Sequence, residues 1–215
     1  MNVKLIGQFI QYVDVELQPG ESFYAQKGAL ICQDAGVSKE LAFNGGGGLT
    51  RLLGAKLSGE SIFIVRYANN DRRPLHVQFG SSIGLLPIRL EGETLICRSG
   101  AYVASSNMVT VTTKLSISGF VGGMGFMLQK IQGNATVFLD TIGQPIVRDL
   151  AYGETVECDE DHIIALQGIT ESQMSSSWSL RNVLGGEGLS MLKVTGPGKV
   201  YLSPGNMAPR LENKV

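Results

Sequence analysis

Hydrophobic and polar residues alternate with a period of two along several stretches of the chain. In YVDVELQ (residues 12–18) valine and leucine alternate with aspartate and glutamate, and in MVTVTTKLSIS (residues 108–118) apolar and β-branched residues alternate with polar ones. Successive side chains of a strand point to opposite faces, so both stretches predict half-buried strands. The apolar run SIFIVRY (residues 61–67) predicts a strand covered on both faces, and PLHVQFG (residues 74–80) predicts an added strand.

Helical periodicity is scarce by comparison. Only LTRLLGAKL (residues 49–57) and SLRNVL (residues 179–184) have the spacing for one or two helical turns. Glycines lie close to both stretches and disfavour longer helices, because glycine is a poor helix former. The sequence therefore predicts an all-β fold.

Two motifs recur three times along the chain. A Gly-Glu pair follows a strand-like run at Gly20, Gly92 and Gly153. A second glycine, followed by an apolar strand, comes 38, 40 and 42 residues after the three glutamates. We predict that all six glycines form turns of one repeated unit; the second set is Gly59, Gly133 and Gly196.

This recurrence predicts three internal repeats within a single all-β domain. Their expected boundaries are residues 13–67, 88–141 and 148–204, within a domain of residues 1–215 that ends in a tail at 205–215. We expect a pseudo-threefold relation among them, in a fold of the double-stranded β-helix or β-sandwich type. The copies share one core, because no low-complexity linker separates them.

Glycine-rich pieces precede the second motif, as in NGGGGLTRLL (residues 44–53). A phosphate-binding P-loop requires GxxxxGK[ST], and no Gly-Lys-Ser/Thr occurs in the sequence. We interpret these glycines as corners or bulges between strands. The glutamates of the three pairs, Glu21, Glu93 and Glu154, either converge on the pseudo-threefold axis or accept backbone hydrogen bonds in turns, and we favour the turns.

Composition excludes some classes of function. Only 17% of residues are charged, against a usual ~25%, which favours subunit contacts, with a compact, weakly charged monomer as the alternative. The net charge of −1 provides no field for nucleic acid, which we do not expect as a partner. His76 and His162 lie far apart in sequence, so we predict no metal site, no cofactor and no catalytic residue.

The cysteines and the N-terminus point to a reducing compartment. Cys32, Cys97 and Cys158 are odd in number and lack Cys-x-x-Cys spacing, which fits neither a disulfide framework nor a zinc site. We expect buried thiols that pack as small apolar residues. The N-terminus has no apolar signal region or transit-peptide character, and we expect a cytoplasmic protein.

One apolar loop is a candidate interaction site. The stretch GFVGGMGFML (residues 119–128) carries Phe120, Val121, Met124 and Phe126 between glycines. Such residues could contact a partner subunit or a membrane surface. The alternative is that they fill the core of the second repeat.

Several motifs together resemble the family named after altered inheritance of mitochondria, number 24. They are VELQPGESFYAQKGALI, the GGGG…LSGES segment, LICRSGAYVAS, GFMLQKIQGNATVFL and NVLGGEGLSMLKVTGPGKVYLSP, and the resemblance runs over residues 13–204. It implies a double-stranded β-helix type of fold, similar to that of the tryptophan RNA-binding attenuation protein, and assembly into oligomers. No catalytic residue set carries over from the family.

The sequence as a whole predicts a non-enzymatic, self-associating interaction or scaffold protein, and so a homo-oligomer. Two alternatives remain open at this point. One is a small-ligand binding protein with a pocket between β layers, its ligand unknown. The other is an organiser associated with a membrane surface through peripheral contact.

Overall fold

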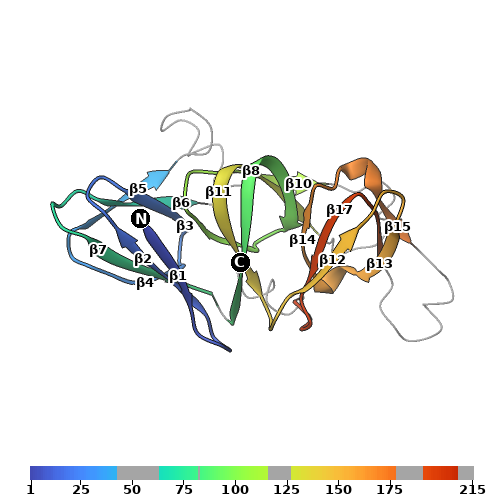
Figure 1. The fold of residues 1–215 in the computed structure, drawn as a ribbon, viewed down its shortest axis with the longest axis horizontal. Helices are drawn as coiled ribbons and strands as arrows, with labels where there is room; N and C mark the ends of the chain where they lie inside the picture. Colours follow the sequence, from blue (N-terminus) through green and yellow to red (C-terminus); the bar gives the residue numbers. More distant parts are fainter. Residues whose placement is uncertain (43–62, 82, 116–126, 178–190, 208–215) are drawn as a thin grey trace.

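The computed structural model describes residues 1–42, 63–81, 83–115, 127–177 and 191–207. Strands make up most of this part of the chain, and two short 3₁₀ helices lie near its C-terminal end. The expected all-β fold is confirmed. The strands form an elongated row, with the N-terminal strands at one end and the C-terminal strands at the other (Figure 1).

We name three parts of the chain by their residues: the N-terminal segment (12–80), the middle segment (84–141) and the C-terminal segment (146–202). One further strand, β1 (Asn2–Ile6), precedes them. The N-terminal segment contains β2 (Tyr12–Leu17), β3 (Ser22–Gln26), β4 (Leu30–Gln33), β5 (Val37–Ala42), β6 (Ile64–Asn69) and β7 (Leu75–Gly80). The middle segment contains β8 (Gly84–Arg98), β9 (Tyr102–Ser105), β10 (Thr110–Leu115) and β11 (Leu128–Thr141). The C-terminal segment contains β12 (Ile146–Leu150), β13 (Thr155–Asp159), η1 (Glu160–His162), β14 (Ile163–Gln167), η2 (Glu171–Gln173), β15 (Met174–Ser177), β16 (Met191–Thr195) and β17 (Gly198–Leu202).

The described strands form three sheets, and every ladder between them is antiparallel. One sheet has the order β1-β2-β7-β4 and another β13-β16-β15. The large central sheet runs β12-β17-β14-β8-β11-β9-β3-β6-β5, with β10 beside β11. Strands from all three segments therefore share one sheet.

Local sequence explains the strands that the alternating pattern predicts. In β2 the side chains of Val13, Val15 and Leu17 are buried while the intervening positions are partly exposed, as the sequence indicates. Strands β6, β7 and β10 form where apolar or alternating runs predict them. The two short stretches with helical spacing, residues 49–57 and 179–184, lie outside the described residues.

Strands pair in the same way around each Gly-Glu pair. The strand before the pair lies beside the last strand of its segment, and the strand after the pair lies beside the next-to-last strand. These ladders are β2–β7 and β3–β6, the two halves of β8 on the two halves of β11, and β12–β17 and β13–β16. Strand β7, which the sequence presents as an addition, thus takes the place that the second half of β11 takes in the middle segment.

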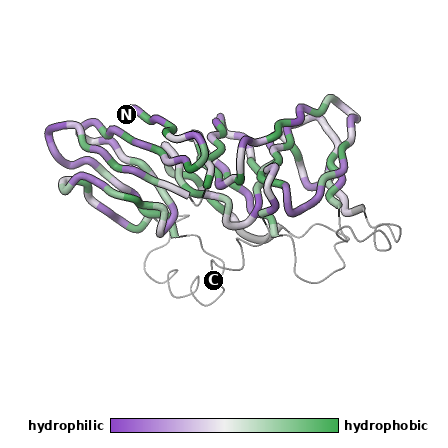
Figure 2. Tube along the Cα trace, turned by 90° about the horizontal axis from the view of Figure 1, so that it is seen from below, coloured by the Kyte–Doolittle hydropathy of each residue, from purple (hydrophilic) through white to green (hydrophobic). Residues whose placement is uncertain are grey.

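Each segment has its own hydrophobic cluster, and neighbouring clusters touch. In the N-terminal segment Phe23 of β3 stacks on Phe79 of β7, with 5.4 Å between ring centroids. Phe138 of β11 belongs to the same cluster and lies 6.2 Å from Phe23. Figure 2 shows hydrophobic and hydrophilic positions interleaved along the strands of the row. The segments are therefore packed against one another.

The glycines of the first motif share a positive φ, and Gly20 and Gly153 lie in the predicted turns, whereas Gly92 lies within strand β8. Gly20, Gly92 and Gly153 have φ angles of 84°, 97° and 77°, which residues other than glycine rarely adopt. In the second motif Gly133 has a φ of 151°. Gly196 does not have a positive φ, and glycine is needed there because a Cβ would fall on the carbonyl oxygen of Ala151.

The third glycine of the second motif, Gly59, lies outside the described residues. Asn69 makes in the N-terminal segment the backbone contacts that Gly196 makes in the C-terminal segment. The Asn69 amide donates to the Glu21 carbonyl at 2.9 Å, and the Gly196 amide donates to the Glu154 carbonyl at 2.8 Å. Position 69 therefore corresponds to Gly196 in the pairing scheme.

Candidate functional site: an open strand edge and its apolar surroundings

The glutamates of the three Gly-Glu pairs each accept a hydrogen bond from a nearby backbone amide, Glu21 and Glu154 beside turns and Glu93 within strand β8. Glu21 accepts a hydrogen bond from the amide of Gln18 at 2.8 Å, and Glu154 accepts one from Ala151 at 3.0 Å. Glu93 accepts the amide of Glu91 at 2.7 Å. The turn interpretation is confirmed for Glu21 and Glu154, and it is wrong for Glu93, which lies where the ladder of β8 with β11 is irregular.

Glu93 also connects two segments. The side-chain amide of Gln167, on β14, donates to Glu93 Oε1 at 2.8 Å. This hydrogen bond, together with the backbone bond from Glu91, lowers the pKa of the Glu93 carboxyl below its usual value. The ionised carboxylate therefore contributes to the contact between the middle and C-terminal segments.

The cysteines differ in exposure. Cys97 is fully buried, and desolvation raises the pKa of its thiol to about 12. Cys158 is also buried, and burial raises its pKa as well. Cys32 is exposed on β4, so the expectation of three buried thiols is wrong for this residue. The reason is that β4 lies at the edge of its sheet.

The two histidines make structural contacts. His162 lies at the end of η1, and its Nδ1 is 2.7 Å from the carbonyl oxygen of Ser203. His76, on β7, lies 3.5 Å from the carboxylate of Asp14. Within the described ranges, no three His, Cys, Asp or Glu side chains are grouped as metal ligands.

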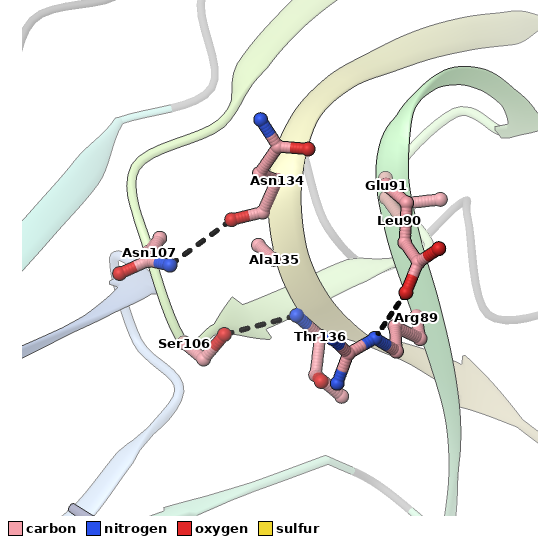
Figure 3. Close-up of a pocket in the computed structure, with 8 residues that line it drawn as sticks. All are labelled: Arg89, Leu90, Glu91, Ser106, Asn107, Asn134, Ala135 and Thr136. Atoms are coloured by element: carbon pink, nitrogen blue, oxygen red, sulfur yellow. Dashed lines mark hydrogen bonds and ion pairs between the residues drawn. The ribbon is translucent and has the colours of Figure 1, made fainter.

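A polar pocket of 260 Å³ lies between β8, β11 and the chain after β9 (Figure 3). Asn107 donates to the carbonyl oxygen of Asn134 at 3.0 Å, and Arg89 Nε donates to Glu91 at 2.8 Å. Ser106 Oγ accepts the amide of Thr136 at 2.9 Å in the same wall. Its lining thus consists of hydrogen-bonding groups and one ion pair, Arg89 with Glu91.

The predicted interaction residues cannot be placed, because Phe120, Val121, Met124 and Phe126 lie outside the described residues. The structure instead reveals an apolar surface that the sequence analysis missed. Its residues come from the turn between β1 and β2 and from β4, two stretches that are far apart in sequence.

This apolar surface consists of Phe9, Ile10 and Ile31. Phe9 is 84% exposed, Ile10 69% and Ile31 58%. Ile10 and Ile31 line one pocket of 420 Å³, together with Tyr12 and Leu30. Phe9 adjoins Ile10 in the turn and is not among the residues that line this pocket. Exposed large apolar side chains beside a surface pocket are typical of an interaction site.

Ile31 is exposed although its counterparts in the other segments are buried. It is the extra residue of a β-bulge where β4 pairs with β7. Val103 is the extra residue where β9 pairs with β11, and Ile164 where β14 pairs with β17. Val103 is 1% exposed and Ile164 0%, because each enters the hydrophobic cluster of the preceding segment.

A hydrogen-bonded polar row lies beside Ile31 on the same sheet. The Cys32 thiol donates to Gln78 Oε1 at 2.5 Å, and Gln78 Nε2 donates to Asp14 at 2.6 Å. The residues that pair with the counterparts of Cys32 are aromatic in the other segments, Phe138 and Tyr201. The outer face of the N-terminal segment is thus more polar than the corresponding internal faces.

The sequence was compared with models of known protein families. The model described as "Mitochondrial biogenesis AIM24" matches residues 3–205, which is nearly the whole chain. The chain belongs to this family. The resemblance to the AIM24 family that the motifs predict is therefore confirmed.

Two proteins from Streptococcus pyogenes are similar to this AIM24 family member. An uncharacterised protein of serotype M6 is 24% identical over 204 residues, covering 91% of this chain and 82% of that protein. A crystal structure of an S. pyogenes protein aligns with a TM-score of 0.73 and 20% identity, covering 100% of this chain and 99% of that one. The second likeness supports the fold of this AIM24 protein. The similarity to the tryptophan RNA-binding attenuation protein stays a prediction.

Among the described residues of this AIM24 protein, neither 3₁₀ helix has the length or apolarity that a membrane-spanning helix requires. The exposed apolar residues Phe9, Ile10 and Ile31 lie on a turn and a strand edge.

Proposed function

We propose that this protein is a non-enzymatic, self-associating interaction or scaffold protein. The observation that carries the proposal is the apolar surface of Phe9, Ile10 and Ile31, next to the open edge of β4. Open strand edges and exposed apolar groups both favour association with another chain. The low content of charged residues, 17%, agrees with a surface that contacts other protein.

We further propose that the three segments are copies of one unit within a single domain. The shared ladders around the Gly-Glu pairs and the shared bulge before Cys32, Ala104 and Ala165 support this. Repetition of a unit that exposes one edge favours assembly, because each copy can cover the edge of the next.

Measurement of mass in solution tests the proposal. Sedimentation velocity or light scattering across the micromolar range should give a mass that rises above the 23.0 kDa of one chain as concentration increases. A single 23.0 kDa species throughout the range would contradict self-association.

A second candidate, binding of a small polar ligand, is favoured by the pocket of Figure 3. Arg89 and the amide of Asn107 could bind an anionic oxygen there. A screen of small carboxylates and phosphates should then raise the melting temperature of the protein, and Arg89→Ala should abolish the rise. A melting temperature that no compound changes would exclude this candidate.

A further inference from the structure

The strands at the two ends of the molecule are paired on one side only. In the part of the chain that the structure describes, β4 pairs with β7 alone and β13 pairs with β16 alone. The corresponding strands inside the row are paired on both sides. Strand β9 pairs with β11 and β3, and strand β8 pairs with β11 and β14. The segments are thus joined edge to edge, β9 on β3 and β14 on β8.

The two internal joints have the same register. In both, the fourth residue after the glutamate of one Gly-Glu pair faces the eleventh residue after the glutamate of the next pair. These facing pairs are Ala25 with Ala104 and Cys97 with Ala165. Because the same register occurs at both joints, the two kinds of strand edge, that of β9 and β14 and that of β3 and β8, are complementary to each other.

The two internal joints also share one packing contact. The bulge residue of the incoming strand, Val103 or Ile164, enters the hydrophobic cluster of the preceding segment. At the N-terminal end of the row Ile31 occupies this position and is 58% exposed, since no described strand pairs with the other side of β4. At the C-terminal end of the row, β13 corresponds to β3 and to the second half of β8, the strands that β9 and β14 pair with at the internal joints. The molecule therefore carries one half of the joint at each end.

We propose that β4 of one copy pairs with β13 of a second copy, in the register of the two internal joints. The proposal rests on the self-association proposed above and names its surface and its partner. Strands β4 and β13 lie at opposite ends of the elongated row (Figure 1), so the partner edge comes from another molecule. The contact is heterologous, and repeated copies form a ring or an open row.

The register sets which residues meet. Cys158 is the fourth residue after Glu154 and Cys32 is the eleventh after Glu21, so these two cysteines face each other across the contact. Ile31 then lies against the cluster that contains Cys158, as Val103 and Ile164 do at the internal joints. Because Gln78 stands where Phe138 stands at an internal joint, the contact buries less apolar surface, and we expect association that depends on concentration.

A charge at position 31 tests the packing. Ile31→Lys should return the protein to a single 23.0 kDa species under conditions where the unchanged protein associates, because the ammonium group would lose its hydration in the contact. The matched control is Leu41→Lys on β5, which is also an exposed apolar residue on an edge strand and should leave association unchanged. Equal association of Ile31→Lys and the unchanged protein would overturn the proposal.

Oxidative cross-linking tests the register independently. Directly opposed residues of antiparallel strands have Cα atoms about 4.5–5.5 Å apart, within reach of a disulfide. Treatment of the associated protein with copper phenanthroline, which takes up the two electrons, should link Cys32 to Cys158 between copies. Peptide mapping should find this link, and Cys32→Ser and Cys158→Ser should each remove it. A Cys32–Cys32 link, or no link in an associated sample, would overturn the proposal.

The outcomes separate this proposal from the broader one. A strictly monomeric protein would contradict self-association itself. A protein that associates, but that neither responds to Ile31→Lys nor forms the Cys32–Cys158 link, would keep self-association and exclude the β4–β13 contact.

Discussion

Asn69 is a buried polar residue with all of its side-chain hydrogen bonds formed inside the protein. Its Nδ2 donates to the carbonyl oxygens of Leu17 and Arg73, each at 2.8 Å, and its Oδ1 accepts the amide of Asp71 at 2.9 Å. These bonds fasten the connection between β6 and β7 to the end of β2. Gly196, at the corresponding position, has no side chain to do this, and its connection to β17 is shorter.

Replacing this side chain should therefore be costly. Asn69→Ala leaves two carbonyl oxygens and one amide without partners, and we expect the free energy of unfolding to fall by about 2 kcal/mol. Urea denaturation measures the change. The neighbouring Asn70→Ala removes only an exposed hydrogen bond to Ser38 and should cost less than about 0.5 kcal/mol. Equal effects of the two substitutions would contradict the role given to Asn69.

Among the elements, strand β8 of the middle segment responds to pH through Glu93. The folded-state pKa of this carboxyl is lowered from 4.5, first by the hydrogen bond from Gln167 and then by the bond from the Glu91 amide. A lowered folded pKa means that ionised Glu93 stabilises the protein above pH 4.5 and that this contribution is lost as pH falls through the folded pKa.

Glu93→Gln should accordingly flatten the acid side of the stability profile. The free energy of unfolding of the variant should be lower than that of the unchanged protein at neutral pH, and the difference should shrink as the solution is acidified below the usual glutamate range. Gln167→Ala removes the donor and should produce a similar flattening. A difference that stays constant across this pH range would show that the carboxylate makes no such contribution.

Sequence patterns predict individual strands much better than the edges between them. Alternation places β2 and β10, and the Gly-Glu pairs mark three glycines with positive φ, two of them in turns and one within β8. The second motif is less reliable, since Asn69 rather than a glycine makes the contacts of Gly196 in the N-terminal segment. The spacing of glycines does not identify the equivalent residue in the N-terminal segment, because backbone hydrogen bonds, and not the residue type, define that position.

Exposure at an edge is also hidden from the sequence. Ile31 and Cys32 belong to an apolar stretch that indicates burial, as the same positions are buried in β9 and β14. Whether a neighbouring strand covers them depends on a partner that is far away in the chain, as β9 is from β3. Local alternation says which face a side chain points to, and not whether another strand covers that face.

At the scale of the whole molecule, Phe138 shows how far the segments depend on one another. It lies on β11 of the middle segment, is 3% exposed, and packs in the cluster of the N-terminal segment near Phe23. The central sheet joins the same two segments through the pairing of β9 with β3. One side chain thus contributes to the stability of two segments.

Phe138→Ala should destabilise both segments together. We expect a loss of about 3–5 kcal/mol in the free energy of unfolding, from the lost contacts and the cavity that remains. Amide hydrogen exchange should accelerate in β7 as well as in β11. Phe9→Ala, at a side chain that is 84% exposed, should change neither. Faster exchange confined to β11 would mean that the segments unfold independently.

The two ends of the row are unlike each other, and this gives any string of copies a polarity. In an open row joined by the proposed β4–β13 contact, one terminus displays β4 and the other displays β13, so copies would add at either terminus in one orientation only. A variant whose β4 edge cannot pair could still bind, through its β13 edge, the β4 edge at the end of a row. No further copy could then bind at that end. Small amounts of such a one-sided variant should shorten strings of normal copies, whereas a copy blunted at both ends would be inert.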